Sequence, residues 1–320
     1  MRIVWISFAP LRRTAKGLTS DLASVRYRIT LPAQGLPGSK VTHLAAGANR
    51  RTLLERFADA EAVILGKLFD PALAPLVLEL MASLRSRGVR VIADYCDDHF
   101  SHAVLGPPYR ALANTADALV ASTEGLAEVL RAQAPAPVSV ITDPVEGERG
   151  APRAGGRRPL RLLWFGHPSN LDTLGLGLSQ LAASPQELAV TLMTAPGFGA
   201  EAMGHRFRPW SIAALFEELG ECDGVIIPSN PYDPRKTVKS PNRFTEALWA
   251  GRFVIAHPLP SYESLSAYGW VGGDLGEGLA WLLENPEAAV ARVASGQQAV
   301  AEHFSPRAIA RAWQAVAEGG

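Results

Sequence analysis

Short apolar runs alternate with longer amphipathic stretches along the first half of the chain. Runs rich in β-branched residues lie at 2–8, 40–45, 62–66, 89–95, 117–122 and 138–142. Their length and continuity are typical of parallel strands that are covered on both faces. The stretch 72–87, which ends before Gly88, and the stretch 123–132, which follows the suitable N-cap Thr123, are predicted helices. This alternation predicts right-handed crossovers and a parallel sheet.

The pattern is interrupted at 143–159, a stretch dense in Pro, Gly and Arg, and then restarts. Further strands are predicted at 160–166, 188–193, 205–210, 224–228 and 252–257. Further helices are predicted at 171–182, 211–220, 241–250, 274–284, 286–302 and 305–317. We therefore expect an α/β protein with two Rossmann-like domains and parallel sheets that face an interdomain cleft. The expected parts are a domain at 1–145, a linker at 146–159, a domain at 160–304 and a C-terminal helix at 305–320.

Composition narrows the class of protein further. The 320 residues suit two domains at roughly 150 residues each, and 48% of them are apolar. The 31 basic and 31 acidic residues give a net charge of zero, which disfavours general binding to nucleic acid. The two cysteines, Cys96 and Cys222, lie too far apart for a zinc motif and favour a reducing compartment. The start MRIVWISFAP is interpreted as a strand and not as a signal peptide, and no stretch of 18 apolar residues is present.

The segment KSPNRFTEALWAG at 239–251 is predicted to be a capped helix. Ser240 suits the N-cap, Pro241 suits the first helical position, and Gly251 suits the C-terminal stop. The apolar residues that share one face and should pack on the sheet are Phe244, Ala247 and Leu248.

The opposite face of this helix carries candidate chemistry. Asn242, Arg243 and Glu246 share it by their spacing, and Lys236 and Lys239 precede it. Basic residues at a helix N-terminus oppose the helix dipole unless an anion binds there, so we expect a diphosphate site. Glu246, one turn deeper, is placed to accept hydrogen bonds from ribose hydroxyls. The alternative is an ordinary capped helix with solvated basic residues.

A second polar cluster, DYCDDHFSH at 94–102, follows the predicted strand 89–95. The like charges of Asp97 and Asp98 are expected to raise the pKa of one carboxyl toward that of a general base, and His99 is the rival base. Two alternatives stay open: a metal site, and a turn whose carboxylates cap the next helix.

Two further segments carry candidate residues. Gly166, His167, Ser169 and Asn170 form the loop after the first strand of the second domain, where a glycine lets a ligand approach the backbone. The alternative is that Ser169 or Asn170 caps the next helix. In the predicted helix 19–36, Arg26, Tyr27 and Arg28 cannot all face the core. One Arg is then expected to point toward an acidic ligand or to lie on a solvated face.

Several of these segments together resemble the GT-B fold glycosyltransferases, in particular the large retaining family with a Glu-x7-Glu motif. The strand end IIPS, the segments KSPNRFTEALWAG and RFVIAHPLP, the segment ADALVASTEGLAEVLR at 116–131 and the loop WFGHPSNLDTL at 164–174 carry the resemblance. It implies that Glu246 binds the ribose of the donor. Val238 stands where the family has its first Glu, and His167 and Thr173 stand near the places of an Arg and a Lys.

The resemblance implies a glycosyltransferase that moves a sugar from a nucleoside-diphosphate sugar to a glycan, lipid-linked or small-molecule acceptor. The second domain would bind the donor, and the first would bind the acceptor. No metal or other cofactor is expected, and the expected location is the cytoplasm, with contact at the inner face of the membrane left open. A sugar-nucleotide epimerase or hydrolase of the same fold is the first alternative. A non-catalytic GT-B-like binding protein is the second, because of Val238.

Overall fold

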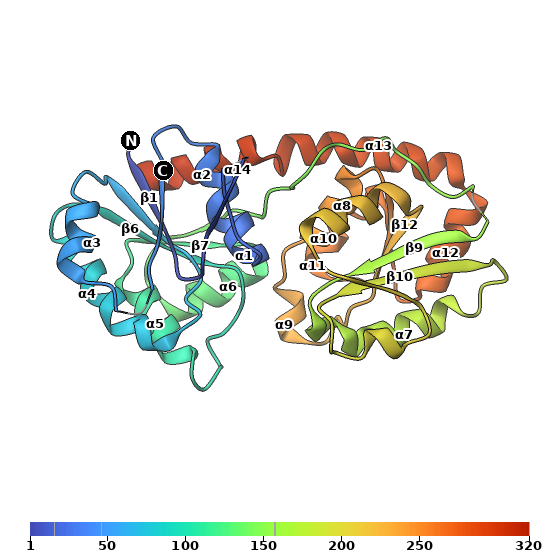
Figure 1. Ribbon diagram of the computed structural model, residues 1–320, viewed down its shortest axis with the longest axis horizontal. Coiled ribbons are helices and arrows are strands. Elements are labelled where there is room, and N and C mark those ends of the chain that lie inside the picture. The colour runs from blue at the N-terminus through green and yellow to red at the C-terminus, as the bar shows by residue number, and fades with distance from the viewer. Residues whose placement is uncertain (16, 46, 157, 320) are drawn as a thin grey trace. The chain divides into compact units, whose positions relative to one another are not determined.

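The computed structural model describes residues 1–15, 17–45, 47–156 and 158–319, which form two compact units (Figure 1). The first unit comprises Met1–Pro144, Val238–Ser240 and Ser305–Gly320, and the second comprises Val145–Thr237 and Pro241–Phe304. Each unit is built on a parallel sheet of six strands. The expected α/β fold with two Rossmann-like sheets is therefore confirmed.

The sheet of the first unit has the order β4-β1-β5-β6-β7-β8. Its strands are β4 (Lys40–His43), β1 (Ile3–Ser7), β5 (Ala62–Leu65), β6 (Arg90–Tyr95), β7 (Ala118–Ala121) and β8 (Val138–Val140). The chain runs from β1 outward to β4 and returns to β5 on the other side of β1. The strand order therefore reverses between β1 and β5.

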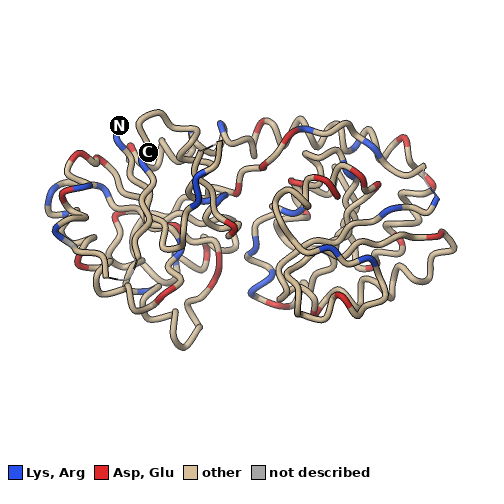
Figure 2. Tube along the Cα trace, in the orientation of Figure 1, with Lys and Arg blue, Asp and Glu red and all other residues tan. Residues whose placement is uncertain are grey.

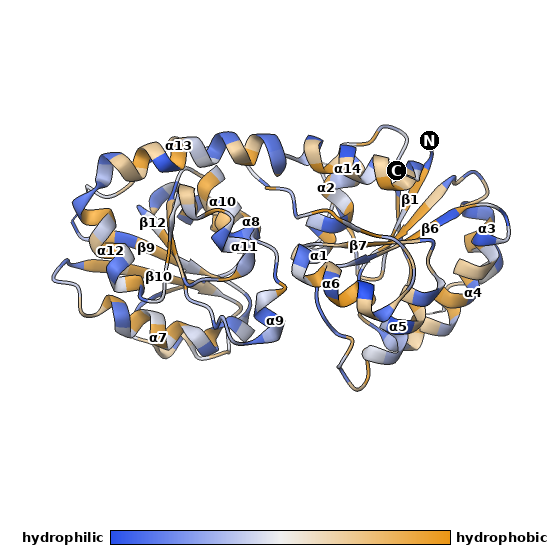
Figure 3. Cartoon of the chain, turned by 180° about the vertical axis from the view of Figure 1, so that it is seen from behind, coloured by the Kyte–Doolittle hydropathy of each residue, from blue (hydrophilic) through white to orange (hydrophobic). Residues whose placement is uncertain are grey.

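Helices cover both faces of this sheet. One layer holds α3 (Arg50–Arg56), α4 (Ala74–Arg85), α5 (Gly106–Thr115) and α6 (Glu124–Gln133). The other holds the run α1 (Ala23–Val25), η1 (Arg26–Thr30) and α2 (Leu31–Gln34), together with α14 (Pro306–Glu318). Side chains of β1 alternate between the layers, so that Val4 lies in the hydrophobic core on the side of α3–α6 and Trp5 contacts Trp313 of α14 edge to face. Figure 3 shows the hydrophobic residues along the strands and on the covered sides of the helices.

The sheet of the second unit has the order β11-β10-β9-β12-β13-β14 and reverses between β9 and β12. Its strands are β11 (Arg206–Pro209), β10 (Leu188–Thr194), β9 (Leu160–Phe165), β12 (Gly224–Ile227), β13 (Phe253–Ala256) and β14 (Trp270–Val271). Its helices are α7 (Leu171–Leu181), α8 (Ile212–Glu221), α9 (Pro234–Thr237), α10 (Asn242–Trp249), α11 (Pro260–Glu263), α12 (Leu275–Glu284) and α13 (Pro286–His303). The second unit also has short 3-10 turns at η3 (Pro168–Asn170), η4 (Ala200–Ala202) and η5 (Ser266–Tyr268), and the first unit has one at η2 (Pro71–Leu73).

The structure adds detail that the pattern does not predict. A short hairpin, β2 (Arg12–Thr14) with β3 (Gly17–Thr19), precedes α1, so the helix expected from residue 19 begins only at Ala23. The described part of segment 146–159 belongs to the second unit, and α14 belongs to the first. Figure 2 shows basic and acidic residues interspersed over both units. Among the described residues, none of the helices combines the length and the apolar character needed to cross a membrane.

Candidate functional site

The reversal point of the second sheet carries the first group of candidate residues. Gly166 and the turn η3 follow β9, whereas α9 and α10 follow β12. Open α/β sheets bind their ligands outside the carboxyl ends of the strands at this point. Contacts between Lys236 and Asn170, and between Arg243 and the Gly166 position, join the two segments there. The structure therefore brings together residues that lie far apart in the chain.

The start of α10 differs from the prediction by one residue. The helix begins at Asn242 with Pro241 in the cap position, and no side chain of the described residues caps it. The prediction that Ser240 is the N-cap is wrong, because its hydroxyl donates to Asp143 Oδ2 instead. The backbone N–H of Arg243 donates to Asn242 Oδ1 at 2.9 Å. The first turn of α10 presents the positive end of the helix dipole.

Arg243 extends from this first turn toward the loop after β9. Its Nη2 atom donates to the hydroxyl of Tyr262 at 3.4 Å. Its Nη1 atom is buried and has no hydrogen-bond partner among the described residues. A β-carbon added to Gly166 would lie 3.4 Å from this Nη1 and 3.2 Å from Asn170 Nδ2. The glycine thus leaves a small space that is bordered by two nitrogen donors, one of them cationic, which suits an anionic oxygen.

Lys236 is engaged by the protein itself. Its side chain is largely buried, and its Nζ donates to Ser169 O at 3.0 Å, to Asn170 Oδ1 at 2.8 Å and to Asp172 Oδ1 at 3.5 Å. Burial lowers the pKa of Lys236, against the opposing effect of Asp172. An ammonium group has three N–H donors, and these contacts occupy them all. Lys236 therefore positions the loop 166–170 in this structure.

His167 and Ser169 interact with each other at the exposed end of the same loop. His167 Nδ1 accepts from the backbone N–H of Ser169 at 3.2 Å and lies 2.9 Å from its hydroxyl. His167 thereby caps η3, whereas Asn170, at the cap position of α7, does not cap it with its side chain. The amide of Asn170 bonds to Lys236 instead.

Glu246 lies in the second turn of α10, and its side chain is 4% exposed. The sequence pattern places it on the polar face with Asn242 and Arg243, which are half-buried in the structure, whereas Glu246 is buried. A carboxylate is costly to bury without polar partners, so its presence here marks a polar environment within the unit.

Residues 238–240, which precede Pro241 and α10, belong to the first unit. Val238 is buried in its core, and its carbonyl accepts from the Thr123 hydroxyl at 2.9 Å. Lys239 forms an ion pair with Asp97, and Ser240 donates to Asp143. Lys239 therefore faces the candidate loop 97–99 in this structure. Val238, which the resemblance aligns with the family's first Glu, lies in the core of the first unit.

Asp97, after the end of β6, accepts from two ammonium groups. Lys67 Nζ lies 2.5 Å from its Oδ2, and Lys239 contacts its Oδ1. Burial raises the pKa of this carboxyl, but the two lysines outweigh burial and lower the pKa to about 2. This direction is opposite to the one expected from the Asp97–Asp98 pair. Lys67 was not among the expected site residues, although it directly follows the apolar run 62–66 and could have been found there.

Asp98 and His99 complete this loop in different ways. Asp98 Oδ1 accepts from the backbone N–H of Phe100 at 3.0 Å within a turn, but no side chain of the described residues caps the next helix, α5. His99 is half-buried with its ring 5.3 Å from that of Tyr109. Burial and then the charge of Lys67 lower the pKa of His99, which favours its neutral imidazole. His99 is thus better suited than Asp97 to accept a proton.

A buried charge network lies near Ser240 in the first unit. Arg28 Nη2 donates to Asp94 at 2.7 Å, and its Nη1 donates to Asp143 at 3.1 Å. The expectation that Arg26, Tyr27 and Arg28 cannot all be buried is wrong, since each is at most 2% exposed. Both guanidinium groups have acceptors, because Arg26 donates to the carbonyls of residues 20 and 21.

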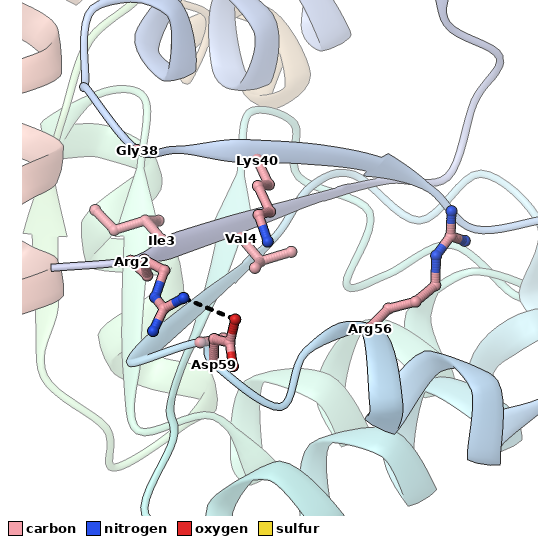
Figure 4. A pocket seen from close by; sticks show the side chains of 8 residues that line it. Arg2, Ile3, Val4, Gly38, Lys40, Arg56 and Asp59 are labelled. Atoms are coloured by element: carbon pink, nitrogen blue, oxygen red, sulfur yellow. Dashed lines mark hydrogen bonds and ion pairs between the residues drawn. The ribbon is translucent and has the colours of Figure 1, made fainter.

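Two cavities lie away from these residues, at the amino ends of the strands. The cavity in Figure 4, beside β1 and β4, measures about 10 Å³, and Arg2 donates to Asp59 at its rim at 2.7 Å. A cavity of about 540 Å³ lies beside the starts of β9, β10 and β11. Among the described residues, no three His, Cys, Asp or Glu side chains gather closely enough to bind a metal ion.

Comparison with known proteins supports the fold. No protein-family model matches the chain, and no curated protein matches its sequence. HepE of Anabaena, solved in complex with UDP, is similar in structure over 100% of both chains, with 11% identity and a TM-score of 0.71. The lipopolysaccharide outer core galactosyltransferase WaaB is similar over 98% of both chains, with 12% identity and a TM-score of 0.59. The pneumococcal O-GlcNAc transferase GtfA, solved with UDP and GlcNAc, is similar over 84% of this chain and 59% of its own, with 14% identity and a TM-score of 0.59. The chain has the GT-B fold of these proteins, as the resemblance implies.

Proposed function

We propose that the protein is a glycosyltransferase that moves a sugar from a nucleoside-diphosphate sugar to a hydroxyl group of an acceptor. The observation that carries this proposal is the buried Nη1 of Arg243, which has no hydrogen-bond partner in the described part of the chain and faces the space beside Gly166. An uncompensated buried cationic donor is costly, and a diphosphate oxygen would satisfy it. UDP is the first nucleotide to test, because HepE and GtfA were solved in complex with it.

The donor is proposed to bind to the second unit. Arg243 and the N-terminus of α10 would stabilise the negative charge that develops on the leaving diphosphate. Lys236 would position the loop 166–170 through its bonds to Ser169 and Asn170. Glu246 would accept hydrogen bonds from the ribose hydroxyls, in the role that the resemblance implies. Fixed donors of this kind need no bound metal.

The acceptor is proposed to bind to the first unit, beside the loop 97–99. In an inverting reaction the acceptor oxygen forms a bond to the anomeric carbon while the bond to the diphosphate breaks. The proton of the acceptor hydroxyl passes to the neutral imidazole of His99. Asp97, whose pKa is lowered by Lys239 and Lys67 against burial, stays a carboxylate and orients the two lysines. A retaining reaction would need no enzyme base here.

The cellular setting is part of the same proposal. Both cysteines are free, which agrees with the expected reducing compartment and a cytoplasmic location. The acceptor class remains a glycan, a lipid-linked sugar or a small molecule, and the lipid-linked class would bring the protein to the inner face of a membrane.

A non-catalytic nucleotide-sugar-binding protein is the second candidate function. The observation in its favour is Val238, which stands in place of an acidic residue of the resembled family and is buried in the first unit. This candidate predicts tight nucleotide binding without turnover.

Nucleotide release from a panel of sugar donors tests both candidates. The protein is incubated with each donor, with and without a cell-extract acceptor fraction, and Arg243→Ala is the matched negative variant. Release that depends on the acceptor supports transfer, and release without acceptor supports the hydrolase alternative. Binding without any release supports the non-catalytic candidate. Failure to bind any of the nucleotides contradicts the proposal.

A further inference from the structure

Two lysines share one carboxylate at the carboxyl edge of the first sheet. Lys67 follows β5, Asp97 follows β6, and Lys239 comes from the segment 238–240. The side chains of Lys67 and Asp97 are 17% and 16% exposed, so this ion pair is mostly shielded from water. Lys239 is 46% exposed and approaches Asp97 at its other oxygen.

The cluster has more cationic donors than acceptors. Neither lysine has a second acidic partner among the residues that the structure describes, and the Oδ1 of the neighbouring Asp98 accepts from Phe100. Lys67 also lies 5.3 Å from the centre of the Phe69 ring. Each ammonium group has three N–H donors, so several remain for a ligand. The cluster therefore has an uncompensated positive charge in a partly buried place, which favours an anion.

A purely structural role does not account for Lys67. The segment 238–240 is already attached to the first unit by the buried Val238, by the bond from Thr123 to its carbonyl and by the bond from Ser240 to Asp143. Lys239 with Asp97 adds an ionic contact to this attachment. Lys67 bonds to the other oxygen of this carboxylate, and no bond joins it to the segment 238–240 among the described residues.

We propose that the acceptor carries an acidic group, a carboxylate or a phosphate ester, which binds to Lys67 and Lys239 beside the reacting hydroxyl. This inference rests on the proposed function and names the acceptor class for it. Asp97 keeps the two ammonium groups in place until the acid group binds and takes over part of their hydrogen bonding. The acid group fixes the acceptor on the loop that carries His99, so that its hydroxyl lies near the imidazole.

Binding of small sugars to the full chain, measured by NMR titration, tests this inference. The probes are glucuronic acid, glucose 1-phosphate, glucose and inorganic phosphate, each with UDP present. We expect at least one anionic sugar to bind about tenfold or more tightly than glucose, as a charge-assisted bond provides. Lys67→Met should abolish this preference and leave the affinity for UDP unchanged. Lys40→Met, which removes an exposed lysine of β4, is the matched control and should keep the preference.

Asp97→Asn provides an opposite prediction that does not depend on how Lys67→Met folds. Removing the competing carboxylate frees both lysines, so the anionic sugars should bind several-fold more tightly than to the wild type. A structural ion pair would give unchanged or weaker binding, which overturns the inference. The inference is also overturned if the wild type binds glucose as tightly as the anionic sugars. It is likewise overturned if inorganic phosphate binds as tightly as glucose 1-phosphate. If Lys67→Met loses affinity for UDP, the two lysines bind the donor and not the acceptor, and the inference is overturned. A wild type that does not bind UDP contradicts the proposed function instead.

Discussion

Arg243 Nη1 lies 3.4 Å from the point that a β-carbon on Gly166 would occupy. One residue follows β9 and the other lies in the first turn of α10, so the reversal of strand order brings them together. The glycine provides the space and the guanidinium provides the charge. Each half of this arrangement can be tested separately.

Replacement of Arg243 tests the charge. Arg243→Ala should weaken the binding of nucleoside diphosphates by about 1–3 kcal/mol, because charge-assisted hydrogen bonds to the diphosphate are lost. The melting temperature should change little, since Nη1 makes no hydrogen bond within the described protein. Calorimetry with UDP and other nucleoside diphosphates measures the effect. Arg51→Ala, on the exposed face of α3, is the control, and wild-type affinity in Arg243→Ala would contradict the assignment.

Replacement of Gly166 tests the space. The new methyl group of Gly166→Ala would lie 3.2 Å from Asn170 Nδ2 and would fill the place of a ligand oxygen. We expect the affinity for UDP to fall by about tenfold, or about 1.4 kcal/mol, with a folded protein. Gly175→Ala on α7 is a matched control, because nothing lies within 4 Å of its β-carbon. Equal affinities of the two variants would show that the ligand does not approach residue 166.

Glu246→Gln tests the resemblance most directly. The amide preserves the shape but removes the charge, so UDP binding should weaken by about 1–2 kcal/mol. An analogue of UDP that lacks both ribose hydroxyls should bind poorly to the wild type and lose little more in the variant. Calorimetry with both ligands, together with the melting temperatures, decides the role. A variant that melts lower but binds both ligands as the wild type does would make Glu246 a structural residue.

The regular elements could be predicted because the buried strands are continuous apolar runs and the helices end at Gly or begin at Ser, Thr and Pro. Thr123, predicted as an N-cap, does accept from the backbone N–H of Leu126. Ser240 shows the limit of such a local signal. It has the right residue type for a cap, but its hydroxyl donates a hydrogen bond to Asp143, which lies almost a hundred residues earlier in the chain.

The site was harder to predict wherever charges pair across the fold. Arg28 is buried because Asp94 and Asp143 meet it from two other segments, which no spacing along the chain indicates. The pKa of Asp97 is lowered, and not raised, because Lys67 and Lys239 approach it from two other segments. The loop 166–170 was singled out from the sequence because it directly follows β9, and Arg243 because it lies in the first turn of the predicted helix 241–250.

The absence of a metal requirement is a further prediction. Arg243 and the N-terminus of α10 can supply the charge for the leaving diphosphate, and Asp97 is already bonded to two ammonium groups. We expect the rate of sugar transfer in excess EDTA to stay close to the rate without it. Loss of turnover that is restored by manganese or magnesium would instead indicate a metal-dependent reaction.

The pH dependence of transfer tests the role of His99. Burial and the neighbouring Lys67 lower the pKa of this imidazole below its usual 6.5. In an inverting reaction the base must be neutral, so kcat/KM should fall as the pH drops through a pKa that lies below about 6.5. The free energy of unfolding should also decrease as the pH drops through this range. The folded protein binds this proton less readily than the unfolded chain, so the contribution of neutral His99 is complete above about pH 6.5 and is lost at lower pH.

Two variants separate His99 from other groups that titrate in this range. His99→Gln should lower kcat by about a hundredfold or more and remove the acidic limb of the profile, while UDP affinity stays unchanged. Lys67→Met removes the ammonium that lowers the pKa of His99, so the acidic limb should move to higher pH. If the limb keeps its position in Lys67→Met and persists in His99→Gln, another group is the base, or the reaction retains configuration and uses none.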